Sequence, residues 1–409
     1  SYRLNGGAGG VAGEGASGAG VDTNTGAAQT GVTFDLPAAR GAAQPTLSLA
    51  YSSRAGDGEA GLGWQLAHPS IARKRSSDGY VQMPSSDGTV PFSFPKQAYP
   101  TPTPTMSGIP TPGAPLSPTH ADRFEWNGRP LVLVCASVAA GCSGGEAFSP
   151  GVMNTAYYAL QSESGAFVRL FLHNAASGGS HWTVEHKSGV VETYGDPSGD
   201  SLNVATERAP AATGAGIPVR WRLSSASDPN GNGVFYEWRR NPRGNDGEPV
   251  LGGRGLSYLN DIYYSAALGT PGADLSFQAG HAYAYHVALV WERPDFRQQS
   301  YAPVWSARPD LRLKRVDVAA KTWLAEGARQ QVRRYHFGYY PHADSGEYAP
   351  GIHAPLNGHS FLKSVEVEGA SGDEEADERL PTDGQGARLR PRIFHYAPRA
   401  TLFGSHPAT

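Results

Sequence analysis

Cysteine is scarce in this chain of 409 residues, in which only Cys135 and Cys142 occur. Two thiols without further ligands are too few for a structural zinc site. The six residues between them permit a disulfide if the protein is exported, and two reduced thiols remain the alternative. The sequence also lacks any run of the roughly 18 to 20 apolar residues that a membrane-spanning helix needs, so we expect no transmembrane segment.

An excess of charge of one sign is also missing. The chain has 34 basic and 37 acidic residues, a formal net charge of −3, and only 17% charged residues. Proteins that bind polyanions usually carry a basic surface. The short basic runs at 73–75 and 312–315 are common on exposed strands, so we expect no nucleic-acid partner.

Capped amphipathic helices are not evident either. The chain instead combines 52 Gly and 32 Pro with 19 Tyr, 14 Phe and 8 Trp. Aromatic residues favour strands, and Gly, Pro, Asn and Asp favour the turns between them. The composition therefore predicts an all-β protein with many short antiparallel strands.

Alternation of apolar and polar residues locates these strands. In 32–36 and 47–51 every second residue is apolar, which turns one face of each strand inward. Trp64 follows a tight turn made possible by Gly61 and Gly63, and its ring is predicted to fill the core. Further strands are predicted at 129–135, 166–172, 181–186, 190–194, 219–225, 234–240, 258–264, 286–292, 311–318, 332–339, 361–368 and 392–396.

The domain organisation follows from two unusual stretches. Residues 1–25 form a Gly-rich lead-in whose G-x-G-x-x-G at 13–18 lacks the preceding strand and following helix of a nucleotide site. Residues 95–120 are rich in proline, which cannot donate to a strand ladder, so they are predicted to form a surface loop. A peptide-docking role for that loop is the alternative. The remainder, 26–409, is predicted to be one β domain.

Several short motifs occur in an order typical of one protein family. They are Thr25-Gly26, then Gln-Pro-Thr-Leu-Ser-Leu-Ala-Tyr-Ser-Ser at 44–53, Gly-Leu-Gly-Trp at 61–64 and Pro-Ser-Ile-Ala-Arg-Lys at 69–74. A Trp, Gly, Tyr-Gly hairpin at 182–195 and Asp-Pro-Asn-Gly-Asn at 228–232 follow. Together they resemble the N-terminal domain of the SpvB and Tc-toxin B-subunit family, over most of residues 5–400.

The resemblance implies a fold and a function. The fold is a set of long hairpins in a curved, RHS-shell-like sheet. The function is that of a non-catalytic component of a secreted insecticidal or virulence toxin complex, whose hollow β-shell encloses or positions a toxic effector. The implied partners are other toxin-complex or RHS-type subunits, missing downstream parts of the same polypeptide, and the enclosed effector. On this interpretation the important residues are architectural: Trp64, Trp182, Tyr194, Trp221 and Asn232.

One motif has a calcium-binding alternative. Asp228, Asn230 and Asn232 have the alternate spacing of an EF-hand loop, but Arg239 stands where the loop needs its twelfth-position Glu. Asn-Gly is also a strong hairpin turn. We favour a plain hairpin and leave a calcium ion open.

Motifs for catalysis are weak. The acidic run 373–378 is interpreted as a solvated loop, and Glu366 and Glu368 as members of an ordinary alternating strand. The Ser-Thr-Ser strand that should accompany a Glu-x-Glu loop in the family's transferase is missing, as are H-E-x-x-H and G-x-S-x-G motifs. We therefore predict no enzyme activity, and no catalytic, cofactor-binding or metal-binding residues. An exported glycan- or protein-binding module, with aromatic side chains exposed in a groove, is the alternative function.

Overall fold

The structure is a computed structural model, and all regular elements among the residues it describes are strands, as the composition predicts. It describes residues 3–4, 20–73 except 24, 124–136, 155–174 except 163, 164 and 166, 180–197, 203–209, 217–266 except 253 and 254, 283–294, 309–321, 328–340, and 359–397 except 376–378, 383 and 385. No helix in these ranges is long and apolar enough to span a membrane. The Pro-rich loop 95–120 and the motif at 13–18 lie outside the described residues.

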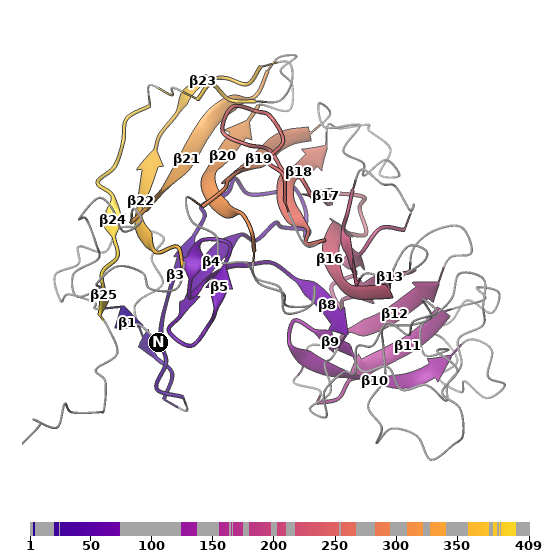
Figure 1. Ribbon diagram of the computed structural model, residues 1–409. Helices are drawn as coiled ribbons and strands as arrows, with labels where there is room; N and C mark the ends of the chain where they lie inside the picture. Colours follow the sequence, from indigo (N-terminus) through magenta and orange to yellow (C-terminus); the bar gives the residue numbers. More distant parts are fainter. Residues whose placement is uncertain are drawn as a thin grey trace, which may run out of the picture.

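Part of the large sheet closes into a ring (Figure 1). In pairing order the ring consists of β8 (Ser70–Arg73), β9 (Phe124–Trp126), β10 (Arg129–Ala136), β11 (Thr155–Leu160), β12 (Arg169–Asn174), β13 (Ser180–Glu185), β14 (Val191–Tyr194) and β16 (Ile217–Ser227). The long strand β16 closes it, because Leu223 pairs with Tyr194 of β14 and Trp221 pairs with Ile71 of β8. β15 (Thr206–Ala209) also pairs with β16.

An extended sheet continues from the C-terminal end of β16, where Ser225, Ala226 and Ser227 pair with the next strand. Its strands are β17 (Gly233–Arg239), β18 (Tyr258–Ala266), β19 (Tyr283–Glu292), β20 (Arg312–Ala320), β21 (Gln330–Tyr339) and β22 (Leu362–Glu368), each antiparallel to the next. β23 (Ser371–Asp373) pairs with β21, and β24 (Arg392–Ile393) pairs with β22. Figure 1 shows that this sheet is curved, as predicted.

The N-terminal residues form a small separate sheet of β2 (Gly20–Val21), β3 (Ala28–Thr33), β4 (Ser48–Ser52) and β7 (Trp64–Ala67), accompanied by the β5 (Asp57–Gly58) and β6 (Gly61–Leu62) pair. This sheet lies on the concave side of the extended sheet (Figure 1). β1 (Arg3–Leu4) pairs with β25 (Tyr396–Ala397), so the lead-in contains two short strands. The Phe34 and Tyr335 rings meet edge to face at 4.9 Å, which joins the two sheets.

The predicted aromatic residues lie in the core. Trp64, Trp182, Tyr194 and Trp221 are fully or almost fully buried. The Nε1 of Trp64 donates to the hydroxyl of Tyr396 at 2.9 Å, which ties the N-terminal sheet to the last described strand. Their roles in the fold are therefore architectural, as expected.

Glycine is required at the turn before Trp64. Gly61 has a φ of +96°, and a Cβ atom there would lie 2.4 Å from the carbonyl oxygen of Ser360. The amide of Leu62 donates to that same carbonyl. The turn thus permits a close backbone contact between the N-terminal part and the segment before β22.

The strand predictions missed β7, β8, β9, β11 and β15, as well as β1, β2, β5, β6 and β23, and did not foresee the ring. Val32 and Phe34 are buried as the alternation predicts, although β3 ends at Thr33. The ring depends on β16 pairing with strands distant in sequence, which local periodicity does not report.

Candidate functional site: a covered row of charged residues

A row of charged side chains crosses the outer face of the extended sheet, opposite the N-terminal sheet. Cross-strand register places Glu237 opposite Asp261, Asp261 opposite Ala288, Ala288 opposite Asp317, Asp317 opposite Arg334, and Arg334 opposite Glu368. We call Glu237, Asp261, Asp317, Arg334 and Glu368 the charged row. Each is at most 3% exposed. Ionisable residues are rarely buried so fully unless they are paired.

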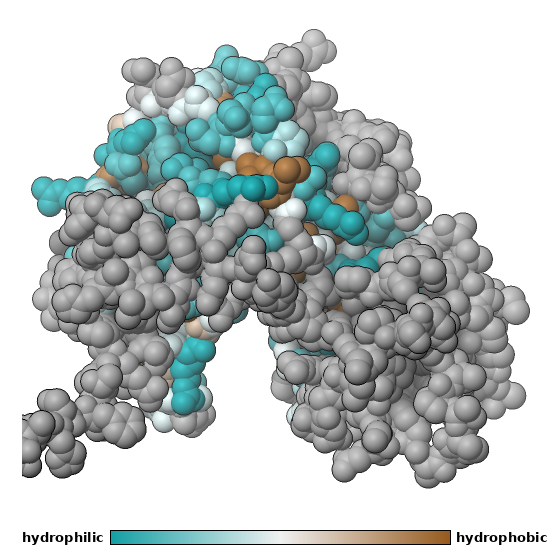
Figure 2. Space-filling view, viewed as in Figure 1, coloured by the Kyte–Doolittle hydropathy of each residue, from teal (hydrophilic) through white to brown (hydrophobic). Residues whose placement is uncertain are grey.

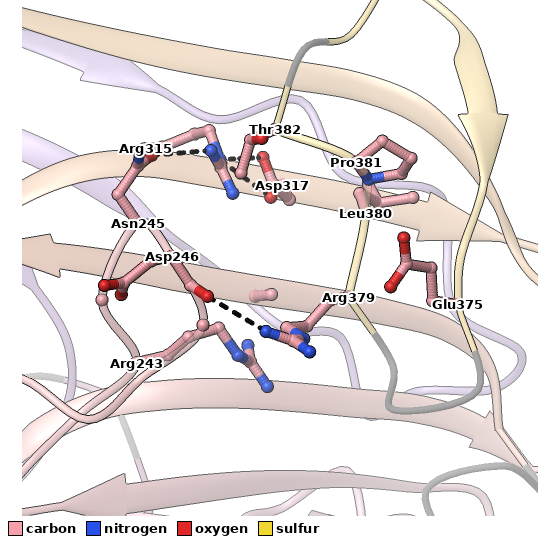
Figure 3. Close-up of a pocket in the computed structure, with 13 residues that line it drawn as sticks. Arg243, Asn245, Asp246, Arg315, Asp317, Glu375, Arg379, Leu380, Pro381 and Thr382 are labelled. Atoms are coloured by element: carbon pink, nitrogen blue, oxygen red, sulfur yellow. Dashed lines mark hydrogen bonds and ion pairs between the residues drawn. The ribbon is translucent and has the colours of Figure 1, made fainter.

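Two segments of the chain lie over the middle of this row. One is the loop 243–247, between β17 and β18. The other, which we call the strap, consists of residues 371–375 and 379–382. Between them lies a cavity of about 250 Å³ (Figure 3), lined by the loop, by Glu375 and 379–382 of the strap, and by Ala288, Arg315 and Asp317 of the sheet. In Figure 2 the surface over the extended sheet is mainly hydrophilic, with one hydrophobic patch near its middle.

Arginine side chains connect the sheet, the loop and the strap around the cavity. The Nε of Arg315 donates to Asp317 at 3.0 Å, and its Nη1 donates to the side chain of Asn245 in the loop at 3.0 Å. From the strap, the Nη1 of Arg379 donates to the backbone carbonyl of Asp246 at 3.1 Å (Figure 3). These bonds hold both covering segments in place over the sheet.

Beside the row, His286 lies between two carboxylates. Its Nε2 is 2.7 Å from the Oδ1 of Asp261, and its Nδ1 is 2.5 Å from the Oε1 of Glu374 in the strap. The ring stacks on Tyr263 with centroids 4.5 Å apart. Arg329 donates its Nε–H to the second oxygen of Glu374 at 2.5 Å. Glu374 is thus held by two cationic groups.

The carboxyls of Glu237 and Asp261 are neighbours and titrate differently. Burial and the adjacent Asp261 raise the pKa of Glu237 to about 7. Burial also opposes ionisation of Asp261, but Arg243 and His286 outweigh it and hold its pKa well below the ordinary value. Arg243 donates to both oxygens of Asp261, at 2.7 and 3.2 Å. Asp261 is therefore the permanent anion of this pair.

The other end of the row is paired as well. Asp317 accepts a bond from the Nε of Arg334 at 2.6 Å in addition to the one from Arg315. Glu368 is 2.7 Å from the Nε2 of His336. Burial opposes the charge on Glu368, but the bonds from His336 and Gln331 lower its pKa. Each buried carboxylate of the row therefore has a basic partner.

The interpretation of 373–378 as a solvated loop is wrong for Glu374, which is only 7% exposed. It is correct for Asp373 and Glu375, which are exposed. Glu366 and Glu368 lie in the strand β22, as interpreted, but Glu368 is fully buried. Alternation of apolar and charged residues predicts a solvated outer face, because it does not show that the loop and strap cover that face.

The motif at 228–232 is a hairpin, as favoured. Backbone amides of Ala42, Asn230 and Asn232 each donate to the Asp228 carboxylate at 2.9 Å. The side-chain oxygen of Asn232 accepts a bond from the Nε of Arg40 at 2.7 Å. Burial opposes the charge on Asp228, but Asn232 and the amides lower its pKa. These donors occupy the carboxylate oxygens that a calcium ion would use, and they attach residues 40–42 to the hairpin.

Apart from Arg315 of the basic run 312–315, the other predicted features play no part in this site. The side chain of Cys135 and all of Cys142 lie outside the described residues. In the basic run 312–315, Arg312 pairs with Glu292 at 2.7 Å and lies over the ring of Tyr339. Among the described residues, no group of three or more His, Cys, Asp or Glu side chains is arranged to hold a metal ion.

The chemistry of the row is mutual neutralisation. Its carboxylates accept bonds from arginine and histidine side chains of the sheet and the loop, and His286 of the sheet links Asp261 of the row to Glu374 of the strap. Buried charges held in this way fix the relative positions of the elements that carry them. The row therefore acts as a connector for the two covering segments.

Comparisons with known proteins identify a related family. Residues 22–91 match the family model described as Salmonella virulence plasmid 65kDa B protein, SpvB. Curated relatives named mono(ADP-ribosyl)transferase SpvB, from Salmonella typhimurium and Salmonella dublin, are 25% identical over 250 residues. That alignment covers 60% of this chain but only 36% and 35% of those relatives, so the chain spans little more than a third of their length.

Solved structures extend the likeness to nearly the whole chain. The crystal structure of TcdB2-TccC3 matches with a TM-score of 0.55 and 18% identity, over 95% of this chain and 17% of that one. The N-terminal domain of effector protein SpvB from Salmonella typhimurium strain LT2 matches with a TM-score of 0.51 and 17% identity, over 83% of this chain and 98% of that one. This chain thus has the fold of the SpvB and Tc-toxin N-terminal region and contains an SpvB-family segment, which confirms the resemblance predicted from its sequence.

Proposed function

We propose that this chain forms part of the wall of a hollow β-shell in a secreted toxin complex, where it encloses or positions a toxic effector. The observation that carries the proposal is the extended sheet β16–β22, which is curved and covered on both faces by segments of the same chain. A wall must keep its shape without help from a ligand. Because segments of the same chain cover both faces of the sheet, the sheet can keep its shape in that role.

We further propose that the chain is not itself an enzyme. Its buried carboxylates are engaged with arginine and histidine partners that hold the loop and the strap. The SpvB relatives are named as transferases, but the aligned part is about a third of their length. The solved N-terminal domain of SpvB, of which 98% aligns, supports assigning this chain to a region distinct from a transferase domain.

The partners proposed are other toxin-complex subunits, RHS-type subunits, or further parts of the same polypeptide. A candidate contact is the segment 387–393 at the end of the extended sheet (Figure 1). Its Leu389 and Ile393 are 66% and 51% exposed. Apolar side chains at the end of a sheet suit docking of another chain.

The alternative, a glycan- or protein-binding module, requires aromatic side chains exposed in a groove. Most of the described aromatic side chains are buried, including Trp64, Trp182, Trp221, Trp238 and Trp291. Phe167 is a described exception, at 62% exposed. This distribution favours the shell proposal.

The test is purification of the native particle from its source, followed by electron-microscopic imaging and intact-mass analysis of each chain. The expected result is a hollow particle that contains this chain and a second polypeptide that resists added protease until the particle is unfolded. A solid, compact particle without a protected polypeptide would contradict the proposal. Glycan-array binding would then test the alternative.

A further inference from the structure

We propose that His286 is a proton-dependent latch that holds the strap on the outer face of the extended sheet. On this proposal the strap is closed while the imidazole carries two protons, and it is released when one proton is lost. The inference is independent of the shell function, because it concerns two segments of this chain alone.

The bonding of the imidazole requires two protons. Both ring nitrogens face carboxylate oxygens, at 2.7 Å for Asp261 and 2.5 Å for Glu374. An ionised carboxylate is only an acceptor, so each nitrogen must donate. In a neutral imidazole one nitrogen lone pair would point at a carboxylate oxygen. The geometry therefore fits the imidazolium form.

The two carboxylates belong to elements of different stability. Asp261 is in the middle of β18 and is also held by Arg243. Glu374 follows the short strand β23 in the strap, where it and Leu380 are buried, while Asp373 and Glu375 are exposed. Loss of a bond to His286 therefore affects the strap more than the sheet, because the strap has fewer buried contacts.

Other charged groups around His286 determine whether the loss of its proton weakens or strengthens the attachment of the strap. Arg329, just before β21, pairs with Glu374, and its guanidinium lies 5.8 Å from the ring of Tyr263. On the other side the facing groups are Asp261 of β18, Arg243 of the loop, and Glu237 with its partner Arg239 on β17. When His286 is neutral, Glu374 retains Arg329 but loses its second cation.

The pH dependence follows from these surroundings. Burial disfavours the charge on His286, but the bonds to Asp261 and Glu374 outweigh it and raise the pKa above the ordinary 6.5. Protonated His286 therefore stabilises the closed strap fully below pH 6.5. This stabilisation is lost as the pH rises through the pKa that His286 has in the closed form. For Glu374, burial is outweighed by His286 and Arg329, so the pKa is lowered. Its contribution is lost only in acid.

Release of the strap would open the cavity. Arg379, Leu380, Pro381 and Thr382 form one wall of it, and Arg315 and Asp317 of the sheet lie in the same cavity (Figure 3). With the strap lifted, these two buried side chains would become accessible. The latch thus controls exposure of part of the charged row.

The experiment is hydrogen–deuterium exchange of the full chain between pH 6 and 10, with exchange times corrected for the intrinsic rate. Peptides that contain 371–375 and 379–382 should exchange about tenfold faster above the transition, the effect of losing one charge-assisted hydrogen bond. Peptides from β19 and β20 should not change. His286→Gln should give fast strap exchange already at pH 6, without the alkaline transition.

The matched control is His359→Gln, which removes a histidine paired with Asp57 at 2.7 Å away from the strap. It should retain the transition. The proposal is overturned if strap exchange in the unmodified chain is constant from pH 6 to 10, or if His286→Gln retains the transition. Nitrogen-15 NMR of labelled histidines checks the protonation without any variant. Two protonated nitrogens on His286 at pH 7 support the latch, and one unprotonated nitrogen overturns it.

Discussion

The two faces of the extended sheet are buried by different physical means. On the inner face, Tyr335 and Phe337 pack against Phe34, which follows β3 of the N-terminal sheet, and Val316 is fully buried. On the outer face, the loop and the strap lie over the middle of the charged row. Adjacent residues of one strand thus meet opposite environments: Val316 is in an apolar core and Asp317 is in an ionic network.

Because the two faces are buried differently, they should respond differently to amino-acid substitutions. Removal of an apolar side chain costs the free energy of its burial plus that of the cavity left behind. Removal of one member of a buried ionic network leaves its partners charged, buried and unpaired, which costs more than the interaction itself contributes. The outer face should therefore be the more sensitive of the two, although it contributes less apolar burial.

The largest expected loss of stability is for Asp317→Leu. The substitution leaves Arg315 and Arg334, both almost fully buried, without their shared carboxylate. We expect the free energy of unfolding to fall by about 3–5 kcal/mol, measured by urea denaturation. A decrease below about 1 kcal/mol would show that these arginines are solvated.

The next largest effect is a pH dependence of the free energy of unfolding that arises from Glu237. Its pKa is raised to about 7, so the unfolded chain ionises first and the folded state is penalised as the pH rises from 4.5 toward 7. The free energy of unfolding should fall by about 3 kcal/mol over that range. Glu237→Gln should largely remove this pH dependence in urea denaturation at several pH values. An unchanged pH dependence in the variant would assign it to other groups.

A smaller effect is expected on the inner face. Val316→Ala removes part of a fully buried side chain next to Asp317 on the same strand. The expected loss is about 2 kcal/mol, without pH dependence. If this substitution is as costly as Asp317→Leu under the same denaturation conditions, the contrast between the faces is lost.

The smallest effect is expected at the surface. Asp35 is paired with Arg333, which precedes the buried Arg334, but its side chain is 68% exposed. Asp35→Asn should change the free energy of unfolding by less than about 1 kcal/mol. A much larger change would mean that exposure is a poor guide to the energetics of these ion pairs.

Much of the fold could be predicted because its signals are local. Alternating apolar residues predicted the strands around Leu49 and Val316, and the glycines before Trp64 predicted its turn. The order of family motifs predicted the curved sheet. The ring was missed because strand pairing between distant segments, such as β8 with β16, leaves no local pattern.

The candidate site was missed for a related reason. Asp261, Asp317 and Arg334 alternate with apolar residues in the way that residues on a solvated face do. Covering segments from elsewhere in the chain contribute to their burial, and one of these segments contains Glu374, which was interpreted as part of a solvated loop. A sequence signal does exist in retrospect: acidic and basic residues occupy the same face of successive strands, which favours cross-strand ion pairs.

The most direct test of the covered charged row is carbodiimide labelling of carboxyl groups in the native full chain, read by peptide mass spectrometry. Glu237, Asp261, Asp317, Glu368 and Glu374 are buried, whereas Asp35, Asp246 and Glu375 are exposed. We predict that each of the buried five is labelled much more slowly than the exposed three, with the sharpest difference between the neighbours Glu374 and Glu375. Equal labelling of the two sets would contradict the account.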